Sequence, residues 1–389
     1  MIKHNLPSDW KKSDFGEIFD FEKKSKHKAS EGEEKGNYKF FTSSNIQKKF
    51  VDDFDFDGDF LVFGTGGIAS MHNPNEKFST STDCLVAKMN DHQILTRYVY
   101  YYLAANMHLL KAGFKGAGLK HISKKYIQNI EINYPDDIET QKKIVAILEK
   151  AEGLKEWRKE ADELTDEFLK STFLEMFYKS NPDYSKWEFV SIKDLTSSKK
   201  GSMRTGPFGS DLKHSEFVDT GIAVLGIDNA VNNRFQWAQR RYITDEKYNK
   251  LKRYTVYPDD VIVTIMATIG KSCVVPKDIP LSISTKHLAV ITCDKTKCNP
   301  QFLSKSMLFH PEIKQQLAKA NVGAIMDGLN LTIIKSSKIP YPPLTLQQRF
   351  ADIVQQVEQL REHQSQSKQQ IDDLFNVLMQ KAFRGELEA

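Results

Sequence analysis

Apolar positions along this chain follow two periods, and each period occurs twice. Runs such as Gly58–Val62 and Asp259–Val263 place apolar and β-branched residues directly after a turn, which is typical of a strand. Two long segments, 138–177 and 344–383, instead repeat apolar residues at alternating steps of three and four. This spacing predicts long helices with a coiled-coil seam, each roughly 60 Å in length. We therefore expect a mixed α and β protein in which each globular part is followed by a long helix.

The predicted seams have a polar middle. In the second helix the seam consists of Phe350, Ile353, Val357, Leu360, Gln364, Ser367, Ile371, Leu374 and Leu378. In the first helix it consists of Ile144, Ile147, Ala151, Leu154, Arg158, Ala161, Thr165, Phe168 and Thr172. Because Trp157 and Leu164 lie beside the first seam, we expect the first helix to be the less regular of the two.

The two halves of the chain are copies of one another. The helical segments align without a gap at an offset of 206 residues (383 − 177), so that Gln141 corresponds to Gln347. Just before each helix, an offset of 207 residues (323 − 116) pairs Gly116-Ala117 with Gly323-Ala324. A period this long indicates a domain duplication rather than a solenoid repeat.

The globular parts also correspond, although their offsets change along the chain. The matching pairs are Trp10 with Trp187, Tyr38–Asn45 with Ile222–Asn229, and an aromatic-rich helix at Arg97–Leu110 with Gln301–Leu317. Changing offsets indicate insertions and deletions, which concentrate in surface loops. The two globular parts therefore share a scaffold and differ in their loops.

These patterns predict an α+β fold, with two duplicated mixed α/β globular domains joined by two long antiparallel coiled-coil helices with pseudo-twofold symmetry. The expected boundaries are 1–137 for the first globular domain, 138–180 for the first helical spacer, 181–343 for the second globular domain and 344–389 for the second spacer. The alternative is two independent domains, each with a helical tail. The gapless match of the helices argues against it, because free tails need no common length.

Composition narrows the class only slightly. The 40% hydrophobic and 27% charged fractions are ordinary for a soluble globular protein, and the net charge of +4 permits a polyanionic partner without requiring one. No apolar run approaches the ~20 residues of a membrane span, and the N-terminal segment has no apolar core of a secretory signal. Four cysteines without framework spacing fit a reduced compartment, so we expect a cytoplasmic protein that does not bind a membrane.

No motif in the sequence predicts catalysis, a cofactor or a metal. Ile269-Gly-Lys-Ser272 ends like a phosphate-binding loop, but position 265, where that motif needs its first glycine, is Ile. Cys273, Cys293 and Cys298 do not have the spacing of a zinc site. We therefore expect no catalytic residue, metal ligand or cofactor in this chain.

Basic and small polar residues gather in the predicted loops. Such residues suit DNA, because Lys and Arg bind phosphates while Asn, Ser, Thr and Arg read base edges. In the first half the candidates are Lys23, Lys24, Ser43, Ser44, Asn45, Lys115, Lys120 and His121. In the second half they are Lys199, Ser202, Arg204, Thr205, Asp228, Asn229, Lys271, Lys286 and His287. The alternative for each is an ordinary solvated loop residue.

The two helix starts carry a repeated motif. Tyr134-Pro135 and Tyr341-Pro342 are each followed by an apolar residue, a Gln (141 and 347) and a further apolar residue. With the Gly-Ala turns, the Trp starts and the helix ends at Ser171–Phe177 and Leu378–Leu387, this motif resembles the specificity subunit of type I restriction-modification systems. The resemblance covers essentially the whole chain.

The resemblance implies that each globular domain is a target recognition domain for one half of a bipartite double-stranded DNA site. The helices would set the spacing and dock two methyltransferase subunits on their outer faces and near Gln141 and Gln347, and restriction/translocase subunits would join the complex. S-adenosylmethionine, ATP and Mg would be bound by those partner chains. The resemblance does not give the sequence of either half-site.

Two other classes of function stay open at this point. The first is a non-catalytic coiled-coil scaffold whose two heads bind proteins. Competition by a polyanion and a steep salt dependence of binding would favour DNA over this alternative. The second is an enzyme with an unrecognised site, which predicts turnover by the purified chain alone.

Overall fold

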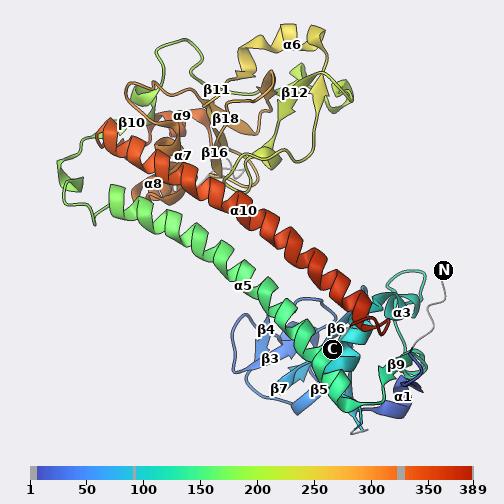
Figure 1. The fold of residues 1–389 in the computed structure, drawn as a ribbon. Helices are drawn as coiled ribbons and strands as arrows, with labels where there is room; N and C mark the ends of the chain where they lie inside the picture. Colours follow the sequence, from blue (N-terminus) through green and yellow to red (C-terminus); the bar gives the residue numbers. More distant parts are fainter. Residues whose placement is uncertain (1–6, 91–92, 322–328, 388–389) are drawn as a thin grey trace. The chain divides into compact units, whose positions relative to one another are not determined.

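The structure is a computed structural model that describes residues 7–90, 93–321 and 329–387 (Figure 1). The chain forms two compact units. Unit 1 consists of Met1–Glu160 with Ser365–Ala389, and unit 2 consists of Ala161–Gln364. The two long helices are α5 (Ile138–Phe177) and α10 (Leu344–Ala382), so each helix contributes one part to each unit. The predicted α+β class and the two long helices are confirmed.

Unit 1 is built on a seven-stranded sheet. Its strands are β2 (Phe19–Phe21), β8 (Cys84–Met89), β5 (Phe56–Gly64), β7 (Asn75–Thr80), β3 (Tyr38–Phe41) and β4 (Lys49–Val51) in spatial order, with β6 (Ser70–His72) also paired to β5. Strands β3 and β7 run parallel, and the other neighbours are antiparallel. The Phe78 ring of β7 is fully buried against Phe41, Phe56 and Phe60, so the aromatic runs of the sequence fix this face of the sheet.

The remaining elements of unit 1 pack around the other face of its sheet. They are β1 (Trp10–Asp14), which pairs with β9 (Glu131–Pro135), helices α1 (Phe15–Ile18), α2 (Thr96–Ala105), α3 (Met107–Ala112) and α4 (Lys124–Gln128), and the 3₁₀ turn η1 (Ala29–Glu31). The end of α10 completes this core. Phe383, just past α10, packs its ring against Tyr98 and Tyr102, with centroids 5.4 and 5.5 Å apart.

Unit 2 holds two four-stranded sheets. The first has the order β11 (Met203–Thr205), β18 (Leu288–Ile291), β15 (Val261–Thr264) and β16 (Ser272–Val274). The second has the order β13 (Tyr242–Ile243), β12 (Ile222–Leu225), β17 (Ser282–Ser284) and β14 (Thr255–Val256), and β10 (Phe189–Ser191) pairs with β19 (Lys338–Pro340). The pairings match those of unit 1, because β12 and β17 are parallel as β3 and β7 are.

The end of α5 belongs to the core of unit 2. The shorter helices of this unit are α6 (Asp245–Leu251), α7 (Pro300–Phe309), α8 (Pro311–Asn321) and α9 (Leu331–Ser336), with 3₁₀ turns η2 (Tyr184–Lys186), η3 (Ile192–Leu195), η4 (Gly209–Asp211), η5 (His214–Glu216), η6 (Ile227–Asn229) and η7 (Lys252–Tyr254). Phe177, the last residue of α5, contacts Phe302 of α7 and Phe350 of α10 at centroid distances of 4.8 and 5.3 Å. Phe177 and Phe383 correspond in the duplication, and each packs the end of a long helix against aromatic side chains in the core of its unit.

The α5 and α10 segments run antiparallel within each unit. In unit 2, Gln364 donates a hydrogen bond to Thr165 (2.8 Å), and Phe173 packs against Phe350 further along. In unit 1, the Lys155 ammonium is 2.9 Å from the Asp372 carboxylate. The buried Gln364–Thr165 pair is the polar middle that the sequence predicted, and such a pair favours one register over others.

The predicted seam is wrong at several positions. Leu154 and Phe168 of α5 and Leu360 and Leu374 of α10 are exposed, whereas Leu148, Leu169, Phe173 and Val354, which lie beside the predicted seam, are buried. The helix faces turn to follow the globular cores that the helices also cover, and a strict heptad pattern ignores this second contact. As a result, several apolar side chains on each unit's part of the helices are exposed among the described residues.

Gln141 and Gln347 connect each long helix to its globular part. Both side chains are fully buried. Gln141 accepts from the Leu95 amide (3.0 Å) and donates to the carbonyl of Pro135 (2.9 Å). Gln347 does the same with the Asn299 amide (2.9 Å) and the Pro342 carbonyl (2.9 Å). The expectation that these two side chains contact a partner is therefore contradicted, because buried amides with satisfied hydrogen bonds have no surface to offer.

His310, between α7 and α8, predicts an acid sensitivity of unit 2. Its ring is fully buried and lies against the rings of Phe173, Tyr178 and Tyr184. Burial lowers the pKa of His310 to about 4, below its ordinary value of 6.5. The unfolded chain therefore binds a proton that the folded unit does not, so stability falls as the pH drops from about 6.5 to 4 and levels off below.

The slope attributable to His310 should be of the order of 1.4 kcal/mol per pH unit. Hydrogen exchange of the β15 and β18 amides between pH 7 and 4 measures it, and His310→Gln should flatten the profile. His363→Gln, at an exposed position of α10, is the matched control and should leave the profile unchanged. An equal slope in wild type and His310→Gln would contradict the prediction.

Candidate nucleic-acid interface

Three loops of unit 1 meet beside the ends of β3 and β5, and Ser43 joins two of them. The Ser43 hydroxyl accepts from the amides of Thr65 (3.1 Å) and Gly66 (3.3 Å) and donates to the carbonyl of Asp83 (2.8 Å). Ser43 follows β3, and Thr65 and Gly66 follow β5. A hydroxyl with three bonds fixes the two strand ends to each other, so Ser43 has a structural role at this site.

The third loop is a tight hairpin before α4. Lys115 and His121 exchange two backbone hydrogen bonds (2.9 and 3.0 Å), and the Gly67 amide donates to the Lys120 carbonyl (3.0 Å). Gly67 has a φ of 81° and Gly116 a φ of 146°, values that favour glycine in these turns. The Gly116-Ala117 repeat thus forms the tip of the hairpin. Its counterpart, Gly323-Ala324, lies outside the described residues.

The structure gathers most of the residues predicted for unit 1. Ser44, Asn45, Lys115, Lys120 and His121 are all exposed on the three joined loops. Lys23 and Lys24 are exposed on a neighbouring segment, where the Lys24 ammonium donates to the Thr82 carbonyl (3.2 Å). Because Thr82 precedes the Asp83 carbonyl that Ser43 binds, this basic segment lies next to the joined loops.

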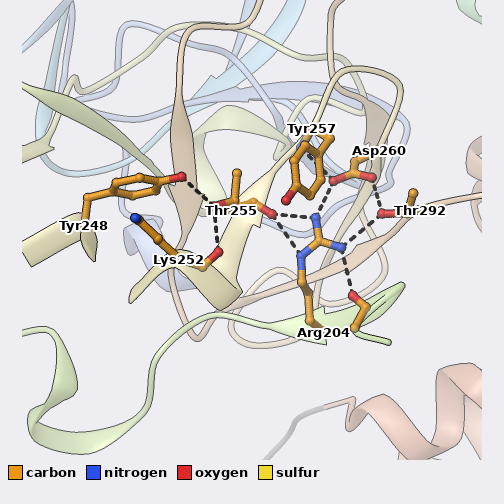
Figure 2. Close-up of polar contacts among 8 residues, drawn as sticks. Arg204, Tyr248, Lys252, Thr255, Tyr257, Asp260 and Thr292 are labelled. Carbon is orange, nitrogen blue, oxygen red and sulfur yellow. Dashed lines mark hydrogen bonds and ion pairs between the residues drawn. The ribbon is translucent and has the colours of Figure 1, made fainter. Parts of the chain in front are cut away.

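In unit 2 the prediction for Arg204 is wrong. Its guanidinium is 9% exposed and lies 2.5 Å from the carboxylate of Asp260, which is fully buried. Figure 2 shows the same guanidinium donating to the Thr255 carbonyl (2.6 Å) and the Thr292 hydroxyl (3.0 Å), beside the Tyr257 ring. Arg204 lies on β11 and Thr255 on β14, so this buried network ties the two sheets of unit 2 together.

Asn229 is also structural rather than a base reader. Its side chain is almost fully buried, accepts from the Gly226 amide (2.8 Å) and donates to the Gln236 carbonyl (2.9 Å). The neighbouring Asp228 is half-buried and paired with Arg241. The Ser-Ser-Asn pattern after β3 and the Ile-Asp-Asn pattern after β12 align in sequence, but only the first leaves its Asn exposed.

The remaining candidates of unit 2 fall at two opposite ends of the strands. Lys271, Lys286 and His287 are half-buried around the end of β15, where the Ile265 amide donates to the His287 carbonyl (2.9 Å). Thr205 is at this end of β11 too, since it pairs with Ala289. Lys199 and Ser202 lie at the other end, where the Thr292 amide donates to the Ser202 carbonyl (2.7 Å). One surface does not contain both groups.

Burial and the Lys286 ammonium lower the pKa of His287, and burial contributes more. His287 is therefore held neutral near physiological pH. It can offer one donor and one acceptor, but it adds no positive charge to this end of unit 2.

Several exposed loop side chains of the two units carry no charge, so a pattern of basic and polar residues does not point to them. In unit 1 they are Ile46, Ile68 and Leu119, and in unit 2 they are Phe208 and Trp237, with Arg240 stacked 5.4 Å from the Trp237 ring. The sequence feature that could have identified them is a single large apolar residue within a loop of small polar and glycine residues. Such a residue is too far from other apolar positions in the sequence to be predicted as part of a hydrophobic core.

Metal clusters and membrane-spanning helices are both absent from the described parts of the chain. No group of three or more His, Cys, Asp or Glu side chains there lies close enough to hold a metal ion. In the same residues no helix has the length and apolar character needed to cross a membrane.

These features define a duplicated α+β protein in which the joined loops of unit 1 gather most of its candidate residues, whereas unit 2 divides its candidates between two strand ends. The chain belongs to the family of the type I restriction modification DNA specificity domain, which matches it twice, at residues 7–162 and 184–373.

Known proteins agree with this assignment, two of them over nearly the full length of the chain. The MjaVIII specificity subunit of a type I restriction enzyme from Methanocaldococcus jannaschii is 23% identical, over 98% of this chain and 94% of its own. The EcoBI specificity subunit of Escherichia coli is 27% identical over 44% of this chain and 37% of its own. A crystal structure of the specificity subunit from M. genitalium shares the fold with a TM-score of 0.59 at 15% identity, covering 98% of each chain.

Proposed function

We propose that this chain is the non-catalytic DNA specificity subunit of a type I restriction-modification complex, in which each unit reads one half of a bipartite target. The observation that carries the proposal is the double match to the DNA specificity family, once in each copy of the duplication. The joined loops of unit 1 support it, because their exposed lysines suit phosphates and their polar tips suit base edges.

The catalytic chemistry would belong to partner chains. Methyltransferase subunits would bind S-adenosylmethionine, and restriction/translocase subunits would bind ATP and Mg. The complex would work in the cytoplasm. This assignment is supported by the relatives named above, which are specificity subunits of type I restriction enzymes.

Mapping methylated bases in the genome of the host tests this function. We expect modification at one sequence made of two unlike half-sites with a gap of unread bases, and its loss when this chain is deleted. Gel shift of the assembled complex should show the same sequence preference and a steep salt dependence. A contiguous palindrome, or binding without sequence preference, would overturn the proposal. Methylation by the purified chain alone would overturn the non-catalytic role.

An apolar groove on the unit 2 part of the helices is the proposed docking surface for a methyltransferase subunit. Its volume is about 390 Å³, and it is lined by Leu164 and Phe168 of α5 and by Ile353, Val357 and Leu360 of α10. Leu164, Phe168 and Leu360 are exposed, so a partner helix would remove their apolar surface from water.

Replacing Leu164 and Leu360 together by Ser should weaken assembly with the methyltransferase subunit at least about tenfold, since two apolar side chains lose their burial. Analytical ultracentrifugation of the mixed subunits measures this. Val218→Ser, which removes an exposed apolar side chain from the globular part of unit 2, is the control. Unchanged assembly of the double variant would place the docking surface elsewhere.

A further inference from the structure

Three large apolar side chains project from the joined loops of unit 1, one from each loop. Ile46, Ile68 and Leu119 are 61%, 71% and 68% exposed. Single exposed apolar residues are common on protein surfaces, but these three come from segments that are distant in sequence and adjacent in space. Together they form an exposed apolar cluster that a ligand could cover.

The backbone that carries the three side chains is held in place. Ile46 follows Ser44, whose hydroxyl accepts from the Ile46 amide (3.2 Å) and whose carbonyl lies 2.7 Å from the His72 ring. Leu119 lies against the turn that carries Ile68, because a Cβ on Gly66 would be 3.9 Å from the Leu119 Cδ2 atom. The three loops therefore present their apolar side chains on a fixed frame, as readout of a ligand requires.

Charge around the three side chains identifies the class of ligand. Lys48, Lys115 and Lys120 are exposed on the same loops, and segments 42–49, 64–73 and 113–123 contain no Asp or Glu. The exposed Asp83 lies nearby but engages the loops through its backbone carbonyl. An apolar cluster bordered by lysines is suited to a polyanion that exposes an apolar group between its phosphates, because the lysines would bind the phosphates and the cluster would cover the apolar group.

Duplex DNA has one such group on its base edges. The 5-methyl of thymine is the only apolar group in the major-groove recognition code, whose other elements are hydrogen-bond donors and acceptors. An apolar side chain against those polar positions would leave them without a hydrogen-bond partner.

We propose that unit 1 recognises thymine 5-methyl groups of its half-site through Ile46, Ile68 and Leu119, with Lys115 and Lys120 on the flanking phosphates. This inference rests on the DNA-reading function proposed above and names the feature that one of the two units reads.

Two of these loops have described counterparts in unit 2. They hold Ile227 and Ile269, which are half-buried, and Ile269 packs against the core. The counterpart of the loop that carries Leu119 lies outside the described residues. Within the described residues, the exposed aromatic side chains Phe208 and Trp237 lie elsewhere in the loops of this unit. Dependence on thymine methyls through Ile46, Ile68 and Leu119 is therefore expected in the half-site that unit 1 reads.

The test replaces each thymine of the mapped target, one at a time, by deoxyuridine, which removes only the 5-methyl group. Fluorescence anisotropy of the assembled complex, at fixed salt, measures the affinity for each duplex. We expect about a fourfold loss for each methyl that an apolar side chain covers, in one half-site and on at least one thymine. Deoxyuridine in the gap serves as the internal control and should have no effect.

A double-mutant cycle connects the methyl to the side chain. In Ile46→Ala, Ile68→Ala or Leu119→Ala complexes, the deoxyuridine penalty at the covered thymine should disappear, because the contact is already lost. Lys115→Gln should instead weaken binding to thymine and uracil duplexes equally and reduce the salt slope by about one. Because all four side chains are exposed, these variants should fold normally.

The outcomes separate this inference from the function beneath it. A half-site without thymine, or deoxyuridine scans without effect, overturns the methyl reading while sequence-specific binding stands. Equal deoxyuridine penalties in wild type and all three alanine variants also overturn it, because the covering residue would be another. Absence of any DNA preference in the complex overturns the proposed function itself.

Discussion

Replacing Asp260 by Asn should lower the free energy of unfolding of unit 2 by about 3–5 kcal/mol, the cost typical of leaving a buried charge without its partner. Asp260 is fully buried and faces the Arg204 guanidinium, the Tyr257 amide (2.8 Å) and the Thr292 hydroxyl (2.5 Å) (Figure 2). The amide of Asn keeps the volume but removes the negative charge. It also turns an –NH₂ donor toward other donors, so Arg204 stays buried and uncompensated.

Hydrogen exchange of the β11, β15 and β18 amides measures this loss, and the exchange of the β5 and β8 amides in unit 1 provides a reference within the same molecule. Glu246→Gln is the matched control, because it breaks the solvent-exposed Glu246–Lys250 pair of α6 and should have no measurable effect. Similar protection factors in Asp260→Asn and wild type would show that the Arg204–Asp260 pair contributes little to holding the two sheets.

This result bears on how variants of Arg204 are interpreted. A substitution at Arg204 should reduce DNA binding only through the stability of unit 2, and therefore equally for every DNA sequence. An arginine in a polar loop pattern predicts a phosphate or guanine contact, yet Asp260 and Thr292, its partners, are 56 and 88 residues away along the chain. A local sequence pattern cannot predict which residues pair at these separations, because the pairing depends on the tertiary packing of the whole unit.

The duplication was the part of the fold that the sequence predicted best. The corresponding residues Gln141 and Gln347 make the same bonds, and Ser123 and Asn330 cap α4 and α9 in the same way, by accepting from the amide three residues on. Local rules of spacing and capping act over a few residues, so they leave a readable pattern. The roles of such residues are less readable, since the two Gln side chains were expected on a partner surface and are buried.

The loops show the limit of prediction from sequence most clearly. Ser44, Lys115 and His121 meet because Ser43 ties β3 to β5 and Gly67 ties β5 to the hairpin. Lys199 and Lys286 do not meet, because they precede β11 and β18, which run antiparallel and therefore begin at opposite ends of the sheet. Both sets are basic loop residues in the sequence. Strand direction and pairing, which depend on the whole sheet, determine which of them share a surface.

Inserting seven residues into each long helix should change the gap in the DNA target and leave both half-sites unchanged. Because α5 and α10 each belong to both units, insertions after Glu160 and after Gln364 fall at the boundary between the units in both helices. Seven residues preserve the heptad phase, so Lys155 can still reach Asp372 in unit 1 and Arg361 can still reach Asp166 in unit 2.

Methylation mapping of the altered complex measures the new target. Seven residues add roughly 10 Å of helix, which sets an upper limit of about three base pairs on the change in gap, because the units must also follow the twist of the DNA. Insertion into α5 alone is the control, since it removes the register between the helices and should abolish assembly or recognition. If the paired insertion changed a half-site instead of the gap, the helices would take part in reading bases, and the division between fixed spacer and variable loops would be wrong.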